Sequence, residues 1–186
     1  LLGATQCSSP ILVCKVAVIC ERASKLVAAG TLICDINFMW RSLHQIVSNM
    51  ALIPQKDQDV HDIDLICATC YETLLKSEVT SMVSLNSCLI AGMFELLREA
   101  TSVSCIGKIL ACFEMICTQH VLCRQLVDLQ FLATVAELTQ NETLLEGEFS
   151  LFLPILHIVV SLLQEIGDEA ADFVPCELIS LLCRII

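Results

Sequence analysis

The sequence predicts an all-α protein, and three observations support this fold class. Leu, Ile, Val and Ala dominate the chain, of which 56% is hydrophobic and 17% charged. Six Gly and four Pro among 186 residues are too few for the many turns of an all-β protein. A short, a medium and a long segment of helical character also follow one another repeatedly. We therefore expect a single all-helical domain over residues 1–186, with a sizeable core.

The first predicted repeat covers residues 21–76, after a helix over 10–20 that is expected to end a preceding repeat. Its short helix ends at Gly30, because glycine readily adopts the left-handed conformation that stops a helix. An insertion over 53–59, which contains Pro54, separates its second helix from its long third helix. The three helices of this repeat are expected at 21–29, 31–49 and 60–76.

Two further repeats, over 77–118 and 119–165, and a truncated one over 166–186 follow the same plan. Ser77 and Ser102 suit the N-cap positions of two of their helices. The helices of the repeat over 77–118 are expected at 78–84, 87–99 and 103–118. Those of the repeat over 119–165 are expected at 123–127, 131–138 and 149–165. The truncated repeat is expected to have a helix at 168–173 and another that begins at Pro175. The corners between first and second helices fall at Gly30, Asn86, Gln130 and Pro175, which are 56, 44 and 45 residues apart. The last two spacings match the roughly 40 to 47 residues of armadillo and HEAT repeats.

Two corners also carry residues typical of a known family. Leu126-Val127-Asp128 and the VAAG segment at 27–30 match parts of a short helix that ends in Asp-Ala-Gly. The ATVAEL segment at 133–138 matches the second helix that continues it. In these segments the chain resembles the armadillo/HEAT-type helical-repeat family. The resemblance implies an α-solenoid of armadillo-like three-helix repeats, in which stacking buries the face that one repeat leaves open. A compact bundle without repeats is the alternative.

Both ends of the sequence interrupt this pattern. The chain begins with Leu1 rather than Met and stops within the truncated repeat, so it is expected to be a fragment of a longer protein. Four residues near the C-terminus have the spacing of a buried helix face, namely Leu178, Leu181, Leu182 and Ile185. Flanking repeats of the same chain are expected to cover such end faces.

The charge of the chain argues against two classes of ligand. The formal net charge is −11, and the ten Lys and Arg residues are scattered along the sequence. Because no basic stripe exists, binding of nucleic acid or of an anionic membrane surface is not expected. The longest charge-free apolar run, 149–163, has 15 residues, whereas a membrane span needs about 20. This run therefore predicts a buried helix.

Few residues suggest metal binding or catalysis. Cys67 and Cys70 lie one helical turn apart, and Cys117, His120 and Cys123 are the nearest further ligands that zinc would need. A buried core face is the preferred interpretation of these residues, and a metal-bearing helical domain is the alternative. The four His residues lie far apart, and neither a Gly-x-Ser-x-Gly motif nor a phosphate-binding Gly-rich loop occurs. No enzyme activity, cofactor or metal is expected.

Two of the predicted long helices carry similar stripes of small or nearly uncharged residues. The residues expected to bind a partner are Ser104, Lys108, Ala111, Met115 and Thr118 on the first stripe, and His157, Ser161 and Gln164 on the second, which Ser150 and Pro154 extend. Steps of four and three residues place each stripe on one helix face, and the offset of 46 residues matches the repeat. In armadillo arrays the third helices line a concave face, so the two stripes are expected to form the floor of a groove. An ordinary solvated helix face is the alternative.

These features together predict a non-enzymatic protein-interaction scaffold. Its expected partner is a helix or extended peptide with basic flanks, which the negative chain attracts while the neutral stripes take apolar anchors. A purely structural spacer within a large solenoid is one alternative. The Leu- and Cys-rich, aromatic-poor texture also resembles that of helical-repeat factors of meiotic double-strand-break formation. That resemblance implies a scaffold subunit of a nuclear recombination complex as another alternative.

The thirteen cysteines bear on the compartment of the protein. Their number is odd, the chain is not small, and most of them occupy positions where Val or Ala would serve in a helix core. We therefore expect reduced, buried thiols and an intracellular location, in the nucleus or cytoplasm.

Reduction is expected to leave the stability of the native protein unchanged, because no disulfide contributes to it. Dithiothreitol should then shift neither the midpoint of urea unfolding nor the number of thiols that react after denaturation. Mass spectrometry after alkylation, with and without prior reduction, measures that number. Several bridged pairs in the native protein would contradict both the assignment of the thiols and the compartment.

Overall fold

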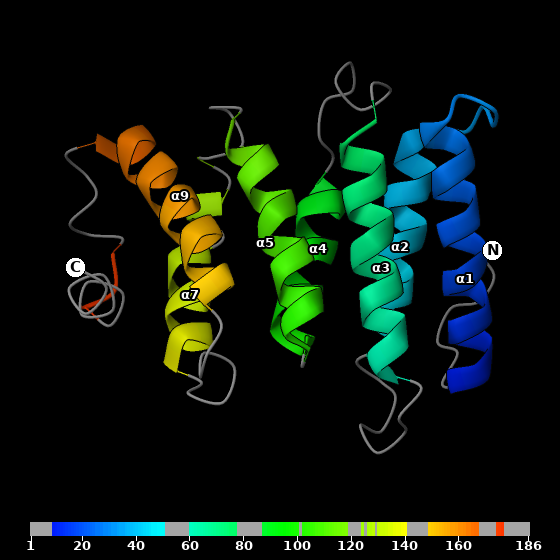
Figure 1. The fold of residues 1–186 in the computed structure, drawn as a ribbon, viewed down its shortest axis with the longest axis horizontal. Coiled ribbons are helices and arrows are strands. Elements are labelled where there is room, and N and C mark those ends of the chain that lie inside the picture. The colour runs from blue at the N-terminus through cyan, green and yellow to red at the C-terminus, as the bar shows by residue number, and fades with distance from the viewer. Residues whose placement is uncertain are drawn as a thin grey trace. The chain divides into compact units, whose positions relative to one another are not determined.

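The computed structural model describes residues 9–50, 60–77, 87–100, 102–118, 124, 126–128, 130–140, 149–167 and 174–176. All regular secondary structure in these ranges is helical, which confirms the predicted all-α class (Figure 1). The helices are α1 (Pro10–Ala28), α2 (Ile36–Met50), α3 (Val60–Leu75), α4 (Ser87–Glu99), α5 (Val103–Cys117), α7 (Phe131–Gln140) and α9 (Phe149–Ile166). None of these described helices combines the length and the hydropathy that crossing a bilayer requires.

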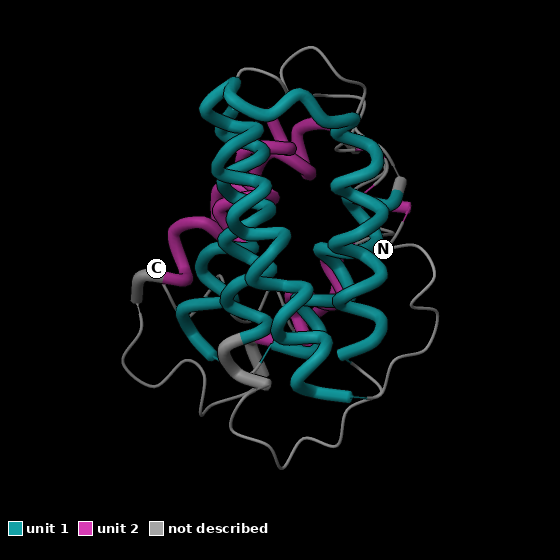
Figure 2. The backbone as a smooth tube through the Cα atoms, turned by 90° about the vertical axis from the view of Figure 1, so that its right-hand side faces the viewer, with its two compact units in different colours: residues 1–109 teal, residues 110–186 magenta. Residues whose placement is uncertain are grey.

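The chain divides into two compact units, residues 1–109 and 110–186, and the division falls within α5 (Figure 2). In the first unit, α1 packs along α3 and α2 packs along α4, and α1 also contacts α2. Helices two apart in sequence therefore lie side by side, as in a helical bundle. The fully buried centre contains Trp40 and Tyr71, whose rings stack with centroids 6.0 Å apart and an interplanar angle of 13°. Burial of such large rings contributes much of the hydrophobic free energy of this unit.

The second unit has its own apolar core. Phe113 of α5 and Phe131 of α7 are both fully buried, and their rings are tilted by 58° with centroids 4.7 Å apart. Further fully buried side chains come from α7 and α9, namely Val135, Ile158, Val159 and Leu162. The residues between them along α9 are partly or well exposed, so that this helix buries one face.

Two predicted corners are confirmed by their backbone conformation. Gly30 has φ 68°, and the amide groups of Thr31 and Leu32 donate hydrogen bonds back to the carbonyl oxygen of Leu26, which ends α1. Gln130 has φ 58°, a left-handed conformation that a residue with a side chain rarely adopts. Its carbonyl oxygen accepts hydrogen bonds from the amides of residues 133 and 134, so the corner also begins α7.

Two predicted helix boundaries are wrong. The division between a helix over 10–20 and another over 21–29 does not exist, because α1 runs without interruption through 19 residues. The Ser24 hydroxyl donates a hydrogen bond of 2.8 Å to the carbonyl oxygen of Cys20 across that position, and neither glycine nor proline interrupts the helix there. The second helix begins at Ile36 rather than at 31, because the carboxylate of Asp35 accepts a hydrogen bond from the Asn37 amide and caps it.

Some of the remaining helix predictions are confirmed, and others concern residues that the structure does not describe. Helix α4 begins and ends where the sequence predicts, and Ser102 caps α5 by accepting a hydrogen bond of 3.2 Å from the Cys105 amide. The helix over 78–84, the corner at Asn86, the insertion over 53–59 and the C-terminal apolar residues lie outside the described residues. The repeat boundary predicted at 21 falls inside α1, whereas those at 77, 119 and 166 stay predictions.

The close approach of α4 to its neighbours generates a stability prediction. A methyl group added at Gly92 would overlap the Tyr71 hydroxyl and lie 3.3 Å from the Cα atom of His44. Because Tyr71 is fully buried against Trp40, it cannot swing away. Gly92→Ala should therefore cost about 1–2 kcal/mol in urea unfolding, although alanine is the better helix former.

The matched control removes the overlapping atom. In a Tyr71→Phe background, Gly92→Ala should cost less than about 0.5 kcal/mol or stabilise the protein. An equal loss of stability in both backgrounds would show that the Tyr71 hydroxyl does not set the distance between these helices.

Candidate interaction surface

The cysteines with metal-ligand spacing lie in the core of the first unit. Cys67 and Cys70 are free thiols and fully buried. Burial raises the pKa of Cys67 well above its usual value and that of Cys70 to about 12, and nearby thiols add to the effect on Cys67. Both shifts follow from the burial of these thiols in the apolar core of the first unit. Within the described ranges, no three His, Cys, Asp or Glu residues are placed to hold a metal ion. His120 and Cys123 lie outside those ranges.

The stripe predicted on α5 lies on the less buried face of that helix. Ser104 and Thr118 are exposed, and the three residues between them on the stripe, Lys108, Ala111 and Met115, are partly exposed. The intervening turns are buried, with Cys105, Ile109, Cys112 and Ile116 at most 1% exposed. The helix phase predicted from sequence is therefore right, whereas a role in binding stays a prediction.

The exposed line on α9 differs from the predicted stripe. His157 and Gln164 are well exposed, as predicted, but Pro154 and Ser161 are only partly exposed. Two aliphatic residues complete the exposed line instead, because Leu153 is 58% and Val160 43% exposed. The predicted stripe does not include them because it follows residues that are not aliphatic. The steps of four, three and four residues from 153 through 157 and 160 to 164 would have indicated one face.

A polar contact joins α5 to α9 within the second unit. Nδ1 of His157 lies 2.6 Å from Oε1 of Glu114, with both side chains about half exposed. Because a carboxylate only accepts hydrogen bonds at neutral pH, the imidazole donates. Ala111 and Met115 lie three residues before and one residue after Glu114 along α5, so the contact brings the two predicted stripes next to each other. Sequence reasoning missed Glu114 because this residue lies beside the stripe rather than on it.

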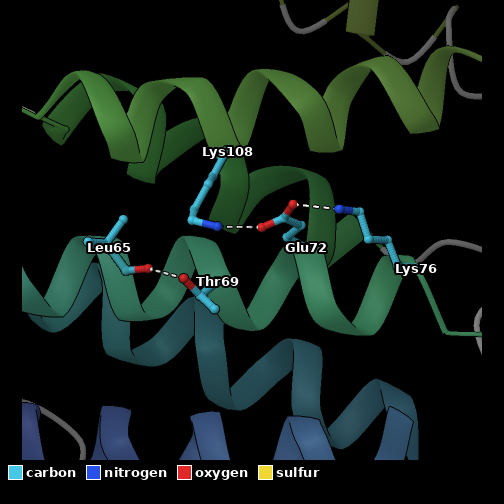
Figure 3. A network of polar contacts seen from close by, with 5 residues as sticks. All are labelled: Leu65, Thr69, Glu72, Lys76 and Lys108. Carbon is cyan, nitrogen blue, oxygen red and sulfur yellow. Dashed lines mark hydrogen bonds and ion pairs between the residues drawn. The ribbon is translucent and has the colours of Figure 1, made fainter.

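Lys108 forms an ion pair that the sequence pattern did not predict. Its ammonium group binds the carboxylate of Glu72 on α3 at 2.6 Å, and Lys76 binds the other oxygen of the same carboxylate at 2.6 Å (Figure 3). Hydrogen bonds from Lys108 and then Lys76 lower the pKa of Glu72. The charge of Lys108 is therefore engaged by a neighbouring helix of the first unit, whereas its role in partner binding stays a prediction.

We define the α5–α9 surface as Ala111, Glu114, Met115, Thr118, Leu153, His157, Val160, Ser161 and Gln164. All of these residues belong to the second unit. Ser104 and Lys108 belong to the first unit and are not part of it. The surface offers apolar side chains, small side chains and one hydrogen-bonded His–Glu pair, and nothing in it has the arrangement of a nucleophile with its base.

The chain was compared with protein-family models, curated proteins and solved structures, and none of them gave a match.

The ion pair between Lys108 and Glu72 predicts a pH-dependent loss of stability on substitution. The folded protein holds the pKa of Glu72 below its unfolded value of about 4.3, so the pair stabilises the fold above that pH. The contribution is lost as the pH falls through the lower folded pKa. Lys108→Met should therefore cost about 1 kcal/mol at about pH 7 and almost nothing at about pH 2, measured by urea unfolding.

Lys76→Met is the matched control, because Lys76 binds the same carboxylate from within α3. A pair within one helix contributes only about 0.3–0.5 kcal/mol. Equal losses for the two variants at neutral pH would show that Lys108 does not hold α3 and α5 together.

Proposed function

We propose that the protein is a non-enzymatic interaction scaffold that binds an amphipathic helix or extended peptide with basic flanks on the α5–α9 surface. One observation carries the proposal. Two large aliphatic side chains, Leu153 and Val160, are well exposed on the same helix line as His157. Exposed aliphatic side chains that lie in one row along a helix form a ridge. A partner helix can pack against such a ridge with the groove between its own side chains.

The proposal includes an α-solenoid of stacked helical repeats as the architecture. Two polar contacts support stacking of successive long helices. Glu72 of α3 binds Lys108 of α5, and Glu114 of α5 binds His157 of α9, in the first and second unit respectively. The partners are 36 and 43 residues apart, and the second separation is close to one predicted repeat. The packing of α1 along α3 and of α2 along α4 fits such stacking as well as a bundle.

The chemistry of the surface favours a particular kind of partner. Leu153, Val160 and Met115 offer apolar contact, and burial of one such side chain is worth about 1.5–3 kcal/mol. Ala111 and Ser161 are small, so a partner side chain can approach the helix backbone between them. The net charge of −11 attracts basic flanks, which would raise the rate of association more than the final affinity.

The test uses a helical peptide of about 18 residues with a Leu stripe at positions i, i+3, i+4 and i+7 and Lys flanks. Its fluorescence anisotropy should report binding to the native chain. Val160→Glu and Ser161→Glu should each weaken binding by about tenfold or more, because the introduced carboxylate must be desolvated under the peptide. Folding should change little, which circular dichroism checks.

The control is Ile19→Glu on α1, which places the same charge at an exposed aliphatic position of the other unit. This variant should bind the basic peptide as the native chain does. Unchanged affinity in both Val160→Glu and Ser161→Glu would overturn the proposal and favour a purely structural spacer. Loss of helicity in either variant would show that the face is core.

A further inference from the structure

The outward face of α1 is the most apolar exposed surface among the described residues. Six of the eight large hydrophobic side chains that are exposed in those residues belong to α1 or to the segment that follows it. These six are Ile11, Leu12, Ile19, Leu26, Leu32 and Ile33, with exposed fractions from 39% to 100%. The opposite face of α1 is buried, with Val13, Ala17, Cys20, Ser24 and Val27. Exposed apolar surface of this extent marks an interaction site.

Two basic residues, Lys15 and Arg22, lie between the exposed apolar residues along α1. Ile11, Lys15, Ile19, Arg22 and Leu26 follow one another in steps of four, four, three and four, which puts them on one line of the helix. Lys15 and Arg22 are exposed, and neither forms an ion pair with a described residue. Glu21 is already paired with Lys25 at the edge of the face. This face is therefore locally positive in a chain that has 21 acidic and ten basic residues.

We propose that the α1 face, the line from Ile11 to Leu26, binds an amphipathic helix of a partner protein whose apolar stripe is flanked by Asp and Glu. Apolar side chains of the partner fill the spaces between Ile11, Ile19 and Leu26. Carboxylates beside that stripe meet Lys15 and Arg22. This site is separate from the α5–α9 surface and takes a partner of the opposite charge.

Charge also distinguishes this occupant from two others. A second copy of the chain that pairs face to face would bring both cations of each α1 against those of the other, and like charges at contact disfavour such a dimer. An anionic bilayer meets the field of the whole chain, whose net charge of −11 repels it. A single partner helix contacts mainly the local charges, because screening at physiological salt limits their reach to about 8 Å.

The test compares two helical peptides of about 18 residues that share one Leu stripe and differ only in Glu or Lys flanks. We expect the acidic peptide to depend on α1, with Ile19→Glu weakening its binding by about tenfold or more in fluorescence anisotropy. Lys15→Glu combined with Arg22→Glu should reverse the preference at α1 toward the basic peptide. Val160→Glu should leave binding of the acidic peptide unchanged, so the result does not depend on the proposed α5–α9 site.

A preference of the α1 face for the acidic peptide would run against the net charge of −11, so it would report the local charges of Lys15 and Arg22. Ile11→Glu is a second variant on the same line and guards against a local folding defect in Ile19→Glu. Acidic-peptide affinity that neither variant reduces would overturn the proposal. So would self-association in sedimentation that Ile19→Glu abolishes, or binding to anionic vesicles that the double charge reversal abolishes.

Discussion

The stacked rings of Trp40 and Tyr71 set the distance at which the helices of the first unit pack. Both rings are fully buried, one on α2 and one on α3, and the Tyr71 hydroxyl reaches the backbone of α4 at Gly92. Only a residue without a side chain fits there, so α4 approaches α2 and α3 closely. Because protein interiors are close-packed, a change in these spacings would also reach the packing of α1 on α3.

Polar side chains on this framework act mainly between helices. Glu95 of α4 accepts a hydrogen bond of 2.8 Å from Ser48 of α2, and Glu72 of α3 is held by Lys108 of α5. Each contact lies at the border of the buried core, where partial desolvation strengthens it and solvent still limits its cost. In contrast, the exposed faces of α1 and α9 keep aliphatic side chains in water. These faces contribute little to the stability of the described fold.

Local chemistry in the sequence predicts much of this fold and less of the surface. Ser102 as a cap, Gly30 as a helix end and the Asp128–Gln130 break act within a few residues, so a reader of the sequence can place them. The continuity of α1 was missed because the repeat pattern predicted a corner where no breaking residue stands. The pairing of Glu114 with His157 joins residues 43 positions apart, and spacing alone cannot predict a contact between two helices. The exposure of Leu153 and Val160 was missed for a related reason. Hydropathy alone predicts that both side chains are buried, whereas the neighbouring helices determine which apolar residues of α9 they cover.

The buried thiols also affect what happens to the chain when it unfolds. With a pKa of about 12, Cys70 has a thiolate fraction at neutral pH more than about a thousandfold below that of an ordinary cysteine. The native core therefore protects its cysteines from oxidants and from disulfide exchange. Unfolding removes that protection from several thiols at once, in a chain that has thirteen of them. In an oxidising solution the unfolded chain can form mispaired disulfides, so a reductant favours reversible refolding.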